Sequence, residues 1–171
     1  ESTKRTEILL KKNLELLSQN QISYTFDYTF WDDMVRFVNE PDSIWAERNI
    51  ISSIKTYKFN CAWVFNSTFK QIFFHNNYNE KDSKQFSLDP ETVKKFFSNG
   101  KFPHFFMKTE KYLLEIAGAP IQYSNDLKRE GIAQGYYITG RIWDDEYLNE
   151  IHKINNSKVF LAYPGIYSEV Q

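Results

Sequence analysis

The residues best suited to catalysis are three histidines and two pairs of adjacent acids. His75, His104 and His152 are isolated, and none has the His-Glu-x-x-His spacing that holds zinc on a helix. The acidic pairs at 32–33 and 144–145 are sequence neighbours, which point in different directions on a helix. The sequence also lacks a phosphate-cradling glycine loop and a Gly-x-Ser-x-Gly elbow. We therefore expect no catalytic residue, no metal site and no cofactor, and a hydrolase is the least favoured function.

Aromatic side chains point instead to a binding surface. The chain has 15 Phe, 11 Tyr and 4 Trp, or 18% aromatic residues. This is more than a core of this size needs, so some of them could line a pocket or an interface. An aromatic-rich core is the alternative, and composition alone does not separate the two. The candidates for ligand contact are Tyr28, Trp31, Asp32, Trp63, Glu115, Tyr137 and Arg141.

The helical spacing near residue 28 and the alternation near residue 115 suggest which side chains point inward. Tyr24, Tyr28 and Trp31 form a stripe expected to face a sheet, and Asp27 lies one helical turn from Trp31 on a shared face. Glu115 has apolar neighbours on both sides, so the period of two in a strand points it inward. A buried carboxylate needs a cationic partner or a ligand.

Most of these candidates have a structural alternative. For Trp31 and Asp32 we favour a brace between helix and sheet, with the carboxylate accepting backbone donors, over direct ligand contact. For Arg141 we favour a surface position or an ion pair with a nearby acid. Trp63 and Tyr137 are ordinary core residues that could also wall a cavity.

Composition bounds the remaining possibilities. A length of 171 residues suits a single domain over residues 1–171. With 42% hydrophobic and 25% charged residues, the chain resembles an ordinary globular domain. The net charge of −1 and the scattered basic residues argue against nucleic acid as a partner. Cys61 is the only cysteine, so it can form no intramolecular disulfide, and we expect it to be a small buried hydrophobe.

The opening forty residues carry the clearest periodic pattern. It is a stripe of mostly apolar residues, spaced by three or four positions and interrupted by the polar Gln21. Its members are Leu10, Leu14, Leu17, Gln21, Tyr24, Tyr28, Trp31, Val35 and Val38. The pattern predicts one long helix over residues 3–38 that ends before Pro41. The leucine half could pair with a partner helix as a coiled coil, while the aromatic half suits packing on a sheet. The alternative is that the whole helix packs within its own domain.

Residues 41–163 read as a short helix followed by an antiparallel sheet. We expect helices over residues 42–57, 89–97 and 144–154, with a polar loop over 76–87. The expected strands are 61–65, 69–74, 105–107, 112–120, 131–143 and 158–163. Asn66, Ser67 and Thr68 fit both a hairpin turn and a glycosylation acceptor, and we favour the turn. The order predicts an α+β fold, with a long N-terminal helix on an antiparallel sheet and the helices on one side.

Two blocks of sequence resemble a known family. The first is Asp27-Tyr28-Thr29-Phe30-Trp31-Asp32-Asp33-Met34-Val35-Arg36-Phe37-Val38, followed by the helical residues 45–54. The second is Ala119-Pro120-Ile121, a polar loop, and then Gly131 and the run from Gly135 to Leu148, which contains Gly140, Arg141, Trp143 and Asp144. In order and spacing these blocks are similar to the fourth type of CHASE domain, an extracellular sensory module of histidine kinases and cyclases. The turn at residues 66–69 departs from the family pattern, which has Asp and Gly there.

The resemblance, which covers about residues 24–150, implies a PAS-like or Cache-like sheet in a periplasmic or extracellular module between two transmembrane helices. No stretch of this sequence approaches the roughly 20 apolar residues that span a bilayer. The chain opens without Met inside the expected helix, so we expect it to be a soluble part of a larger membrane receptor.

The resulting hypothesis is an extracytoplasmic sensor of a bacterial or archaeal receptor with a histidine kinase or cyclic-di-nucleotide output. We expect it to bind an unknown small molecule, to act as a homodimer and to signal through its long helix. The alternative is a periplasmic protein-interaction module without a small-molecule pocket.

Overall fold

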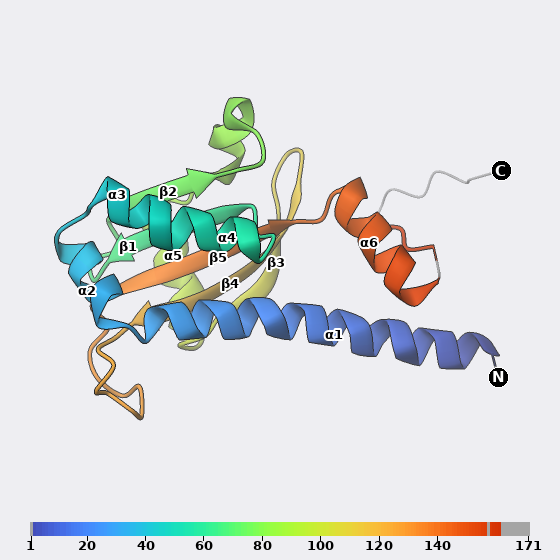
Figure 1. The fold of residues 1–171 in the computed structure, drawn as a ribbon, viewed down its shortest axis with the longest axis horizontal. Coiled ribbons are helices and arrows are strands. Elements are labelled where there is room, and N and C mark those ends of the chain that lie inside the picture. The colour runs from blue at the N-terminus through green and yellow to red at the C-terminus, as the bar shows by residue number, and fades with distance from the viewer. Residues whose placement is uncertain (1, 157, 162–171) are drawn as a thin grey trace.

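The centre of the structure is a five-stranded antiparallel sheet in the order β2-β1-β5-β4-β3 (Figure 1). This computed structural model describes residues 2–156 and 158–161. The strands are β1 (Cys61–Asn66), β2 (Gln71–Asn76), β3 (His104–Lys108), β4 (Leu113–Ile121) and β5 (Gly135–Ile142). The helices are α1 (Ser2–Thr29), α2 (Asp32–Asn39), α3 (Ser43–Ala46), α4 (Ser52–Thr56), α5 (Pro90–Ser98) and α6 (Asp145–Asn155). A π-helical turn, η1 (Glu47–Ile51), joins α3 to α4, and η2 (Glu80–Phe86) is a 3-10 helix.

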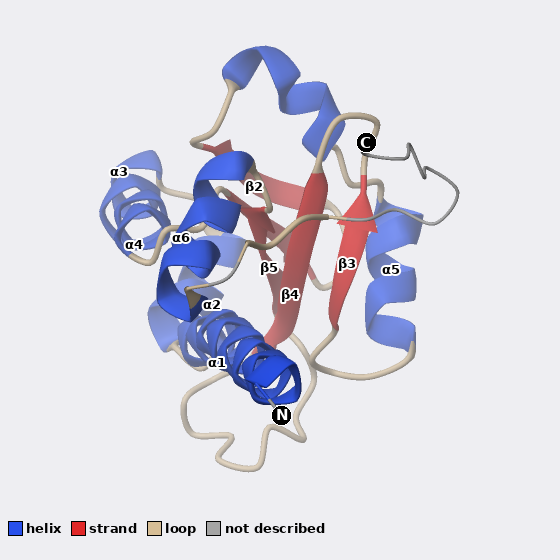
Figure 2. Ribbon diagram, turned by 90° about the vertical axis from the view of Figure 1, so that its right-hand side faces the viewer, coloured by secondary structure: helices blue, strands red, loops and turns tan. Residues whose placement is uncertain are grey.

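Helices cover both faces of the sheet, so the expectation of helices on one side only was wrong. On one face, Tyr24 of α1, Met34 of α2 and Ile54 of α4 pack on Val64 and Tyr137. On the other face, the core includes Phe86 of η2, Val93 of α5 and the strand residues Trp63, Ile116 and Ile138. Figure 2 shows the sheet between α5 on one side and α1 and α4 on the other. Because successive strand residues alternate in direction, each central strand contributes to both cores.

The predicted single helix over residues 3–38 is wrong, because α1 ends at Thr29 and α2 begins at Asp32. Trp31 between them has extended backbone, with φ −153° and ψ 123°. Phe30 forms an isolated parallel bridge with Gln122, whose backbone N–H donates to the Thr29 carbonyl at 2.9 Å. These contacts with the sheet therefore end the helix at Thr29. It follows that Asp27 and Trp31 do not share a helical face.

A buried arginine, Arg129, hydrogen-bonds to the groups at the end of α1. The guanidinium of Arg129 donates to the Thr29 hydroxyl at 2.9 Å and to the Pro120 carbonyl at 2.6 Å, and its Nε donates to Gln122 at 2.7 Å. Carbonyl and hydroxyl groups at a helix terminus need such partners when they are buried. The break is thus specified by residues about one hundred positions away, which local periodicity does not reveal.

Three smaller expectations also changed. The expected helix over 42–57 contains the π turn η1, and the expected polar loop over 76–87 contains η2 with the buried Phe86. Residues 158–161 of the expected last strand are not in a strand, and its residues 162–163 lie outside the described part of the chain. The hairpin turn was predicted correctly, since the Asn66 side chain accepts from the backbone of Thr68 and Lys70.

Helix α1 is longer than the sheet on which it packs. Its C-terminal half contacts β4 and β5, whereas its N-terminal half projects past the sheet and lies near α6 (Figure 1). Asn13 donates to Asn155 of α6 at 2.7 Å. Among the described helices, none is both long and apolar enough to span a bilayer.

Candidate ligand-binding site

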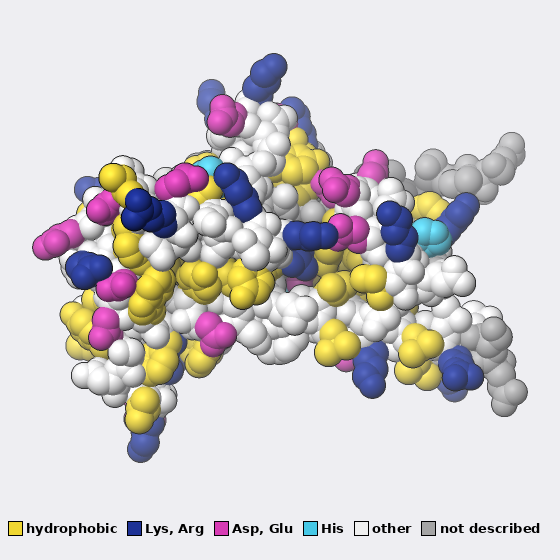
Figure 3. All heavy atoms as spheres, viewed as in Figure 1, with side chains coloured by type: hydrophobic (Ala, Val, Ile, Leu, Met, Phe, Trp, Pro, Cys, Tyr) yellow, Lys and Arg dark blue, Asp and Glu magenta, His cyan; other side chains and the backbone are white. Residues whose placement is uncertain are grey.

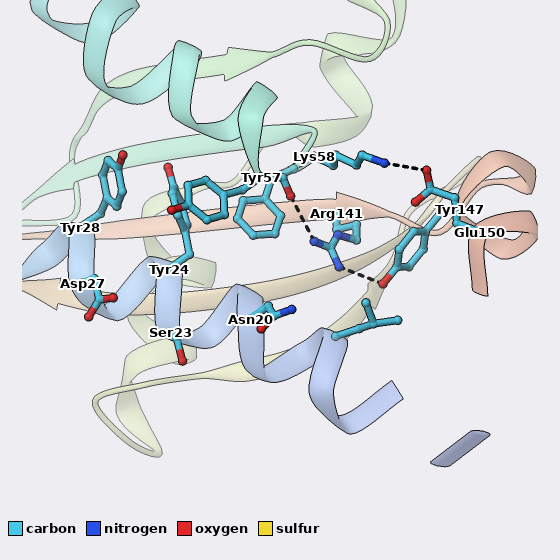
Figure 4. Close-up of a pocket in the computed structure, with 12 residues that line it drawn as sticks. Asn20, Ser23, Tyr24, Asp27, Tyr28, Tyr57, Lys58, Arg141, Tyr147 and Glu150 are labelled. Atoms are coloured by element: carbon cyan, nitrogen blue, oxygen red, sulfur yellow. Dashed lines mark hydrogen bonds and ion pairs between the residues drawn. The ribbon is translucent and has the colours of Figure 1, made fainter. Parts of the chain in front are cut away.

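A hollow of about 570 Å³ lies beside the middle of α1 (Figure 4). Its walls come from one face of α1, the segment that joins α4 to β1, the end of β5 and α6. The lining residues are Leu17, Asn20, Ser23, Tyr24, Asp27, Tyr28, Tyr57, Lys58, Phe59, Arg141, Tyr147 and Glu150. Figure 3 shows hydrophobic side chains gathered in a band over the junction between α1 and the segment α3 to α4. The hollow is large enough for a small metabolite.

Hydrogen bonds between α1 and the sheet fix which face of the helix points into the hollow. The Gln21 side-chain amide donates to the carbonyls of Glu115 and Thr139 at 3.1 and 3.2 Å. The hydroxyls of Thr25 and Thr139 lie 2.7 Å apart. Residues three or four positions apart share a helical face, so Asn20, Tyr24 and Asp27 then line the hollow together.

Tyrosine and phenylalanine rings form the inner wall. The ring of Tyr24 lies 4.4 Å from that of Tyr28, 4.8 Å from that of Tyr57 and 4.9 Å from that of Phe59, between centroids. The Tyr24 hydroxyl is 2.6 Å from the Ser53 hydroxyl and 3.2 Å from the Tyr137 hydroxyl behind it. Burial raises the pKa of both phenols, so they are neutral near pH 7. The wall offers flat apolar surface without charge.

Arg141 is the buried cation of the hollow, with 6% of its surface exposed. Its Nη1 donates to the Tyr147 hydroxyl at 2.8 Å, and its Nη2 reaches the Tyr57 carbonyl at 3.5 Å. The guanidinium carbon lies 4.8 Å from the Phe59 ring centre and 4.9 Å from the Tyr147 ring centre. Its Nε has no hydrogen-bond partner among the described residues. Two aromatic rings therefore hold this group in place while part of its donor capacity is unused.

A second hollow of about 400 Å³ adjoins the first. The two share Lys58, Phe59, Arg141, Tyr147 and Glu150 as lining residues. Lys58 and Glu150 form an ion pair at 2.9 Å, and both side chains are exposed to solvent. Such a pair contributes little to stability. It nevertheless links the α4–β1 segment to α6 at the boundary of the two hollows.

Glu115 forms a polar cluster under α1. One carboxylate oxygen accepts from the Ser18 hydroxyl at 2.5 Å and lies 2.9 Å from Nε2 of His104. The other oxygen accepts from Nε1 of Trp143 at 3.0 Å. Burial alone would raise the pKa of Glu115, but these hydrogen bonds, helped by the charge of Arg141, outweigh it and lower the pKa. The cluster joins α1 to β3, β4 and the end of β5.

Along α1 from Glu7 to Ile22, a third depression of about 590 Å³ runs toward the sheet edge. Its apolar walls include Leu10, Leu14, Ile22, Phe106 and Trp143. This groove is more open and more apolar than the hollow. It contains Leu10 and Leu14 of the leucine half that could pair with a partner helix, whereas Leu17 lines the hollow.

The structure brings two of the predicted site residues, Tyr28 and Arg141, into the wall of the hollow. Tyr137 lies directly behind Tyr24, fully buried. Glu115 points inward, as the alternation predicted, but it contacts α1 rather than lining the hollow.

The other three predicted residues lie elsewhere. Trp31 packs against Trp45, with ring centres 5.3 Å apart. Asp32 accepts a hydrogen bond from the backbone N–H of Ser124 at 2.8 Å, as expected for a brace. Trp63 belongs to the core on the opposite face, where its Nε1 donates to the Phe86 carbonyl at 3.0 Å. None of these three residues lines the hollow, and their contact with a ligand stays a prediction.

Sequence reasoning missed several residues of the hollow. Tyr57, Lys58 and Phe59 follow the end of α4, and Tyr147 and Glu150 lie on α6, so no periodic pattern connects them. A signal did exist on α1. Asn20, Ser23 and Asp27 are polar positions beside the tyrosine stripe, and polar groups next to aromatics on one helical face are typical of a binding surface.

Comparisons with known proteins give one family and one fold. The family model described as the CHASE4 domain matches residues 13–161. A crystal structure of the Vibrio cholerae LuxQ periplasmic domain in its SeMet form aligns with a TM-score of 0.55 and 14% identity, over 96% of this chain and 78% of that chain. A second structure of the Vibrio cholerae LuxQ periplasmic domain gives a TM-score of 0.49 and 13% identity, over 90% and 69%. No curated protein sequence matches the chain. At such low identity the structural likeness concerns the fold alone.

Proposed function

Because the chain belongs to the CHASE4 domain family and is thus an extracytoplasmic, non-catalytic sensory domain of a receptor, we propose that it senses a small molecule in the hollow beside α1. One observation carries this proposal. Helix α1, which runs the length of the domain, itself forms one wall of the hollow. A molecule bound there contacts the helix, the sheet and α6 at once.

Signalling through α1 is the second part of the proposal. A bound ligand changes a protein only by the difference in its affinity for two conformations. A ligand wedged between α1 and the α4–β1 segment favours whichever position of α1 fits it best. Helix shifts of about 1–2 Å at subunit interfaces are among the movements that switch allosteric proteins. Gln21, Thr25 and Ser18 connect the same helix to the sheet, so α1 and the sheet shift as a coupled pair.

We propose that residues 1–171 form a single domain, that transmembrane helices flank it, and that it works as a homodimer. We further propose a histidine kinase or a cyclic-di-nucleotide enzyme as its output. The exposed apolar residues Ile8, Leu9 and Leu16 on the N-terminal half of α1 support contact with a second helix.

The groove on the other side of α1 favours a second candidate function, in which the domain docks a periplasmic protein and needs no small molecule. Its walls are mostly apolar, and Phe106 within it is 48% exposed. Large exposed apolar patches often mark protein interfaces.

Two adjacent exposed positions on α1 separate the candidates. Asn20 lines the hollow and Gln19 lines the groove. Asn20→Trp should fill the hollow, and Gln19→Trp should obstruct the groove, each with little effect on folding since both positions are exposed. The measurement is thermal unfolding of the three proteins against a library of small metabolites. A ligand at 100 times its Kd stabilises the native state by about 2.7 kcal/mol.

The proposal expects a compound that stabilises the wild type and Gln19→Trp but not Asn20→Trp. A library without any such compound would favour the protein-docking candidate. Stabilisation that survives in Asn20→Trp would show that the small molecule binds elsewhere.

A further inference from the structure

The guanidinium of Arg141 is buried with much of its binding capacity unused. Arginine has five N–H donors. Two of them, toward the Tyr147 hydroxyl and the Tyr57 carbonyl, have an acceptor within the described part of the chain, and the second of these contacts is long at 3.5 Å. The Nε–H is buried and unpaired there. With 6% of its surface exposed, Arg141 has little contact with bulk water to replace the missing acceptors.

The charge of Arg141 is also incompletely paired. Within residues 2–156 and 158–161, no carboxylate lies within 4.0 Å of it. Glu115, its partner across β4 and β5, acts on it only through space and already accepts from Ser18, His104 and Trp143. Glu150, the acid in the wall of the hollow nearest in sequence, pairs with Lys58. A buried cation without a direct counter-ion is costly, and an anion from outside would relieve that cost.

The surroundings of Arg141 define what kind of anion fits. The rings of Phe59 and Tyr147 flank the guanidinium and keep its planar fork oriented, which suits a carboxylate with two oxygens. Figure 4 shows Arg141 between Tyr57 and Tyr147, with Tyr57 and Tyr24 leading away from it toward Tyr28 and Asp27. The tyrosine wall suits an apolar or aromatic body. The exposed Asp27, whose side chain has no hydrogen-bond partner among the described residues, would repel a second anionic group.

From these observations we propose that the hollow binds an organic monocarboxylate, with its carboxylate on Arg141 and its apolar body against Tyr24, Tyr28 and Tyr57. This inference rests on the proposed function, because it names the ligand class of the same hollow. Arg141 is then the residue that selects for charge, and Asp27 disfavours dicarboxylates.

The test compares matched acids and amides on the purified chain by calorimetric titration. The probes are acetate, butyrate, benzoate and 3-phenylpropionate, each with its primary amide, and succinate as the dicarboxylate match of butyrate. At least one monocarboxylate should bind roughly 10- to 100-fold more tightly than its amide, which is the range that charge-assisted hydrogen bonds give. Succinate should bind more weakly than butyrate.

Two substitutions at Arg141 and one control assign the effect. Arg141→Gln should abolish the preference for acid over amide, and Arg141→Lys should retain part of it because the charge remains without the fork. Arg36→Gln is the matched control, since Arg36 is exposed, pairs with Asp33 and does not line the hollow. If Arg141→Gln does not fold, the comparison of acids with amides on the wild type still decides the matter.

The outcomes separate this inference from the proposed function. Equal affinity for acid and amide, no binding of any monocarboxylate, or acid preference that persists in a folded Arg141→Gln would overturn the monocarboxylate inference. If neutral compounds bind and Asn20→Trp removes their binding, the small-molecule function stands while the ligand class is wrong. If acids bind equally well to Asn20→Trp, the hollow is not the site and both fail.

Discussion

Glu115 and Arg141 face each other across β4 and β5, on the side of the sheet that carries α1, but they serve different neighbours. Glu115 binds Ser18 of α1 and His104 of β3, whereas Arg141 lines the hollow and contacts Tyr147 of α6. The positive charge of Arg141 helps to lower the pKa of Glu115. An anion bound to Arg141 would weaken that field, so the pair links the hollow to the hydrogen bonds that hold α1.

Removing the charge of Glu115 should make the protein less sensitive to acid. The folded-state pKa of Glu115 lies below the ordinary value, so the carboxylate stabilises the fold above the unfolded pKa of about 4.3 and loses this contribution as the pH falls through the folded pKa. Glu115→Gln should lower the free energy of unfolding by about 2 kcal/mol near pH 7. Urea titrations from pH 7 to pH 3 should show this difference shrinking below about pH 4.3. A difference that stays constant would contradict the account, and the exposed Glu91 supplies the control Glu91→Gln.

The amide of Gln21 should contribute measurably to the docking of α1. Gln21→Leu removes the bonds to the carbonyls of Glu115 and Thr139 but also removes an Oε1 atom that has no partner among the described residues, so the expected loss is about 1 kcal/mol. Hydrogen exchange should report faster opening of α1 around residue 21. Gln19 lies two residues away on a different face of the helix and is exposed, so Gln19→Leu should leave exchange unchanged. Equal protection in both variants would mean that apolar packing alone docks the helix.

Gly140 has no room for a side chain because of Trp63. A Cβ at residue 140 would lie 2.9 Å and 3.0 Å from two ring carbons of Trp63, which is fully buried. Gly140→Ala should cost about 1–3 kcal/mol by overpacking. In the background of Trp63→Phe, which removes the clashing ring atoms, the same change should cost clearly less. Chemical denaturation of the wild type, the two single variants and the double variant measures these costs. If Gly140→Ala lowers the free energy of unfolding equally with and without Trp63→Phe, the contact does not cause the cost.

Periodicity and alternation predicted the central architecture because they report burial directly. The strands around Glu115 and Arg141 and the helix opening at Asp145 followed from local pattern and capping residues. The family resemblance, which depended on the Trp31 block and the Gly140 block, is confirmed by the match over residues 13–161. Both rest on information that lies within short stretches of sequence.

The remaining features depend on contacts between distant segments. The end of α1 at Thr29 is fixed by Gln122 and Arg129, and no local signal at Thr29 announces them. The hollow likewise joins α1 to Tyr57 and Tyr147, which are far apart in the chain. Arg141 was expected at the surface or in an ion pair, yet it is buried without a close carboxylate among the residues described, which only the packing of Phe59 and Tyr147 reveals.

The central claim is that occupancy of the hollow moves α1, and disulfide crosslinking in the full-length receptor tests it most directly. Cysteines in place of Ile8 and Leu9 are suitable because these positions are 60% and 52% exposed, while the native Cys61 is fully buried. With a compound that binds the hollow, the crosslink yields between two copies should change in the wild-type background and stay constant in Asn20→Trp. Identical yields with and without the compound in the wild-type background would contradict the account.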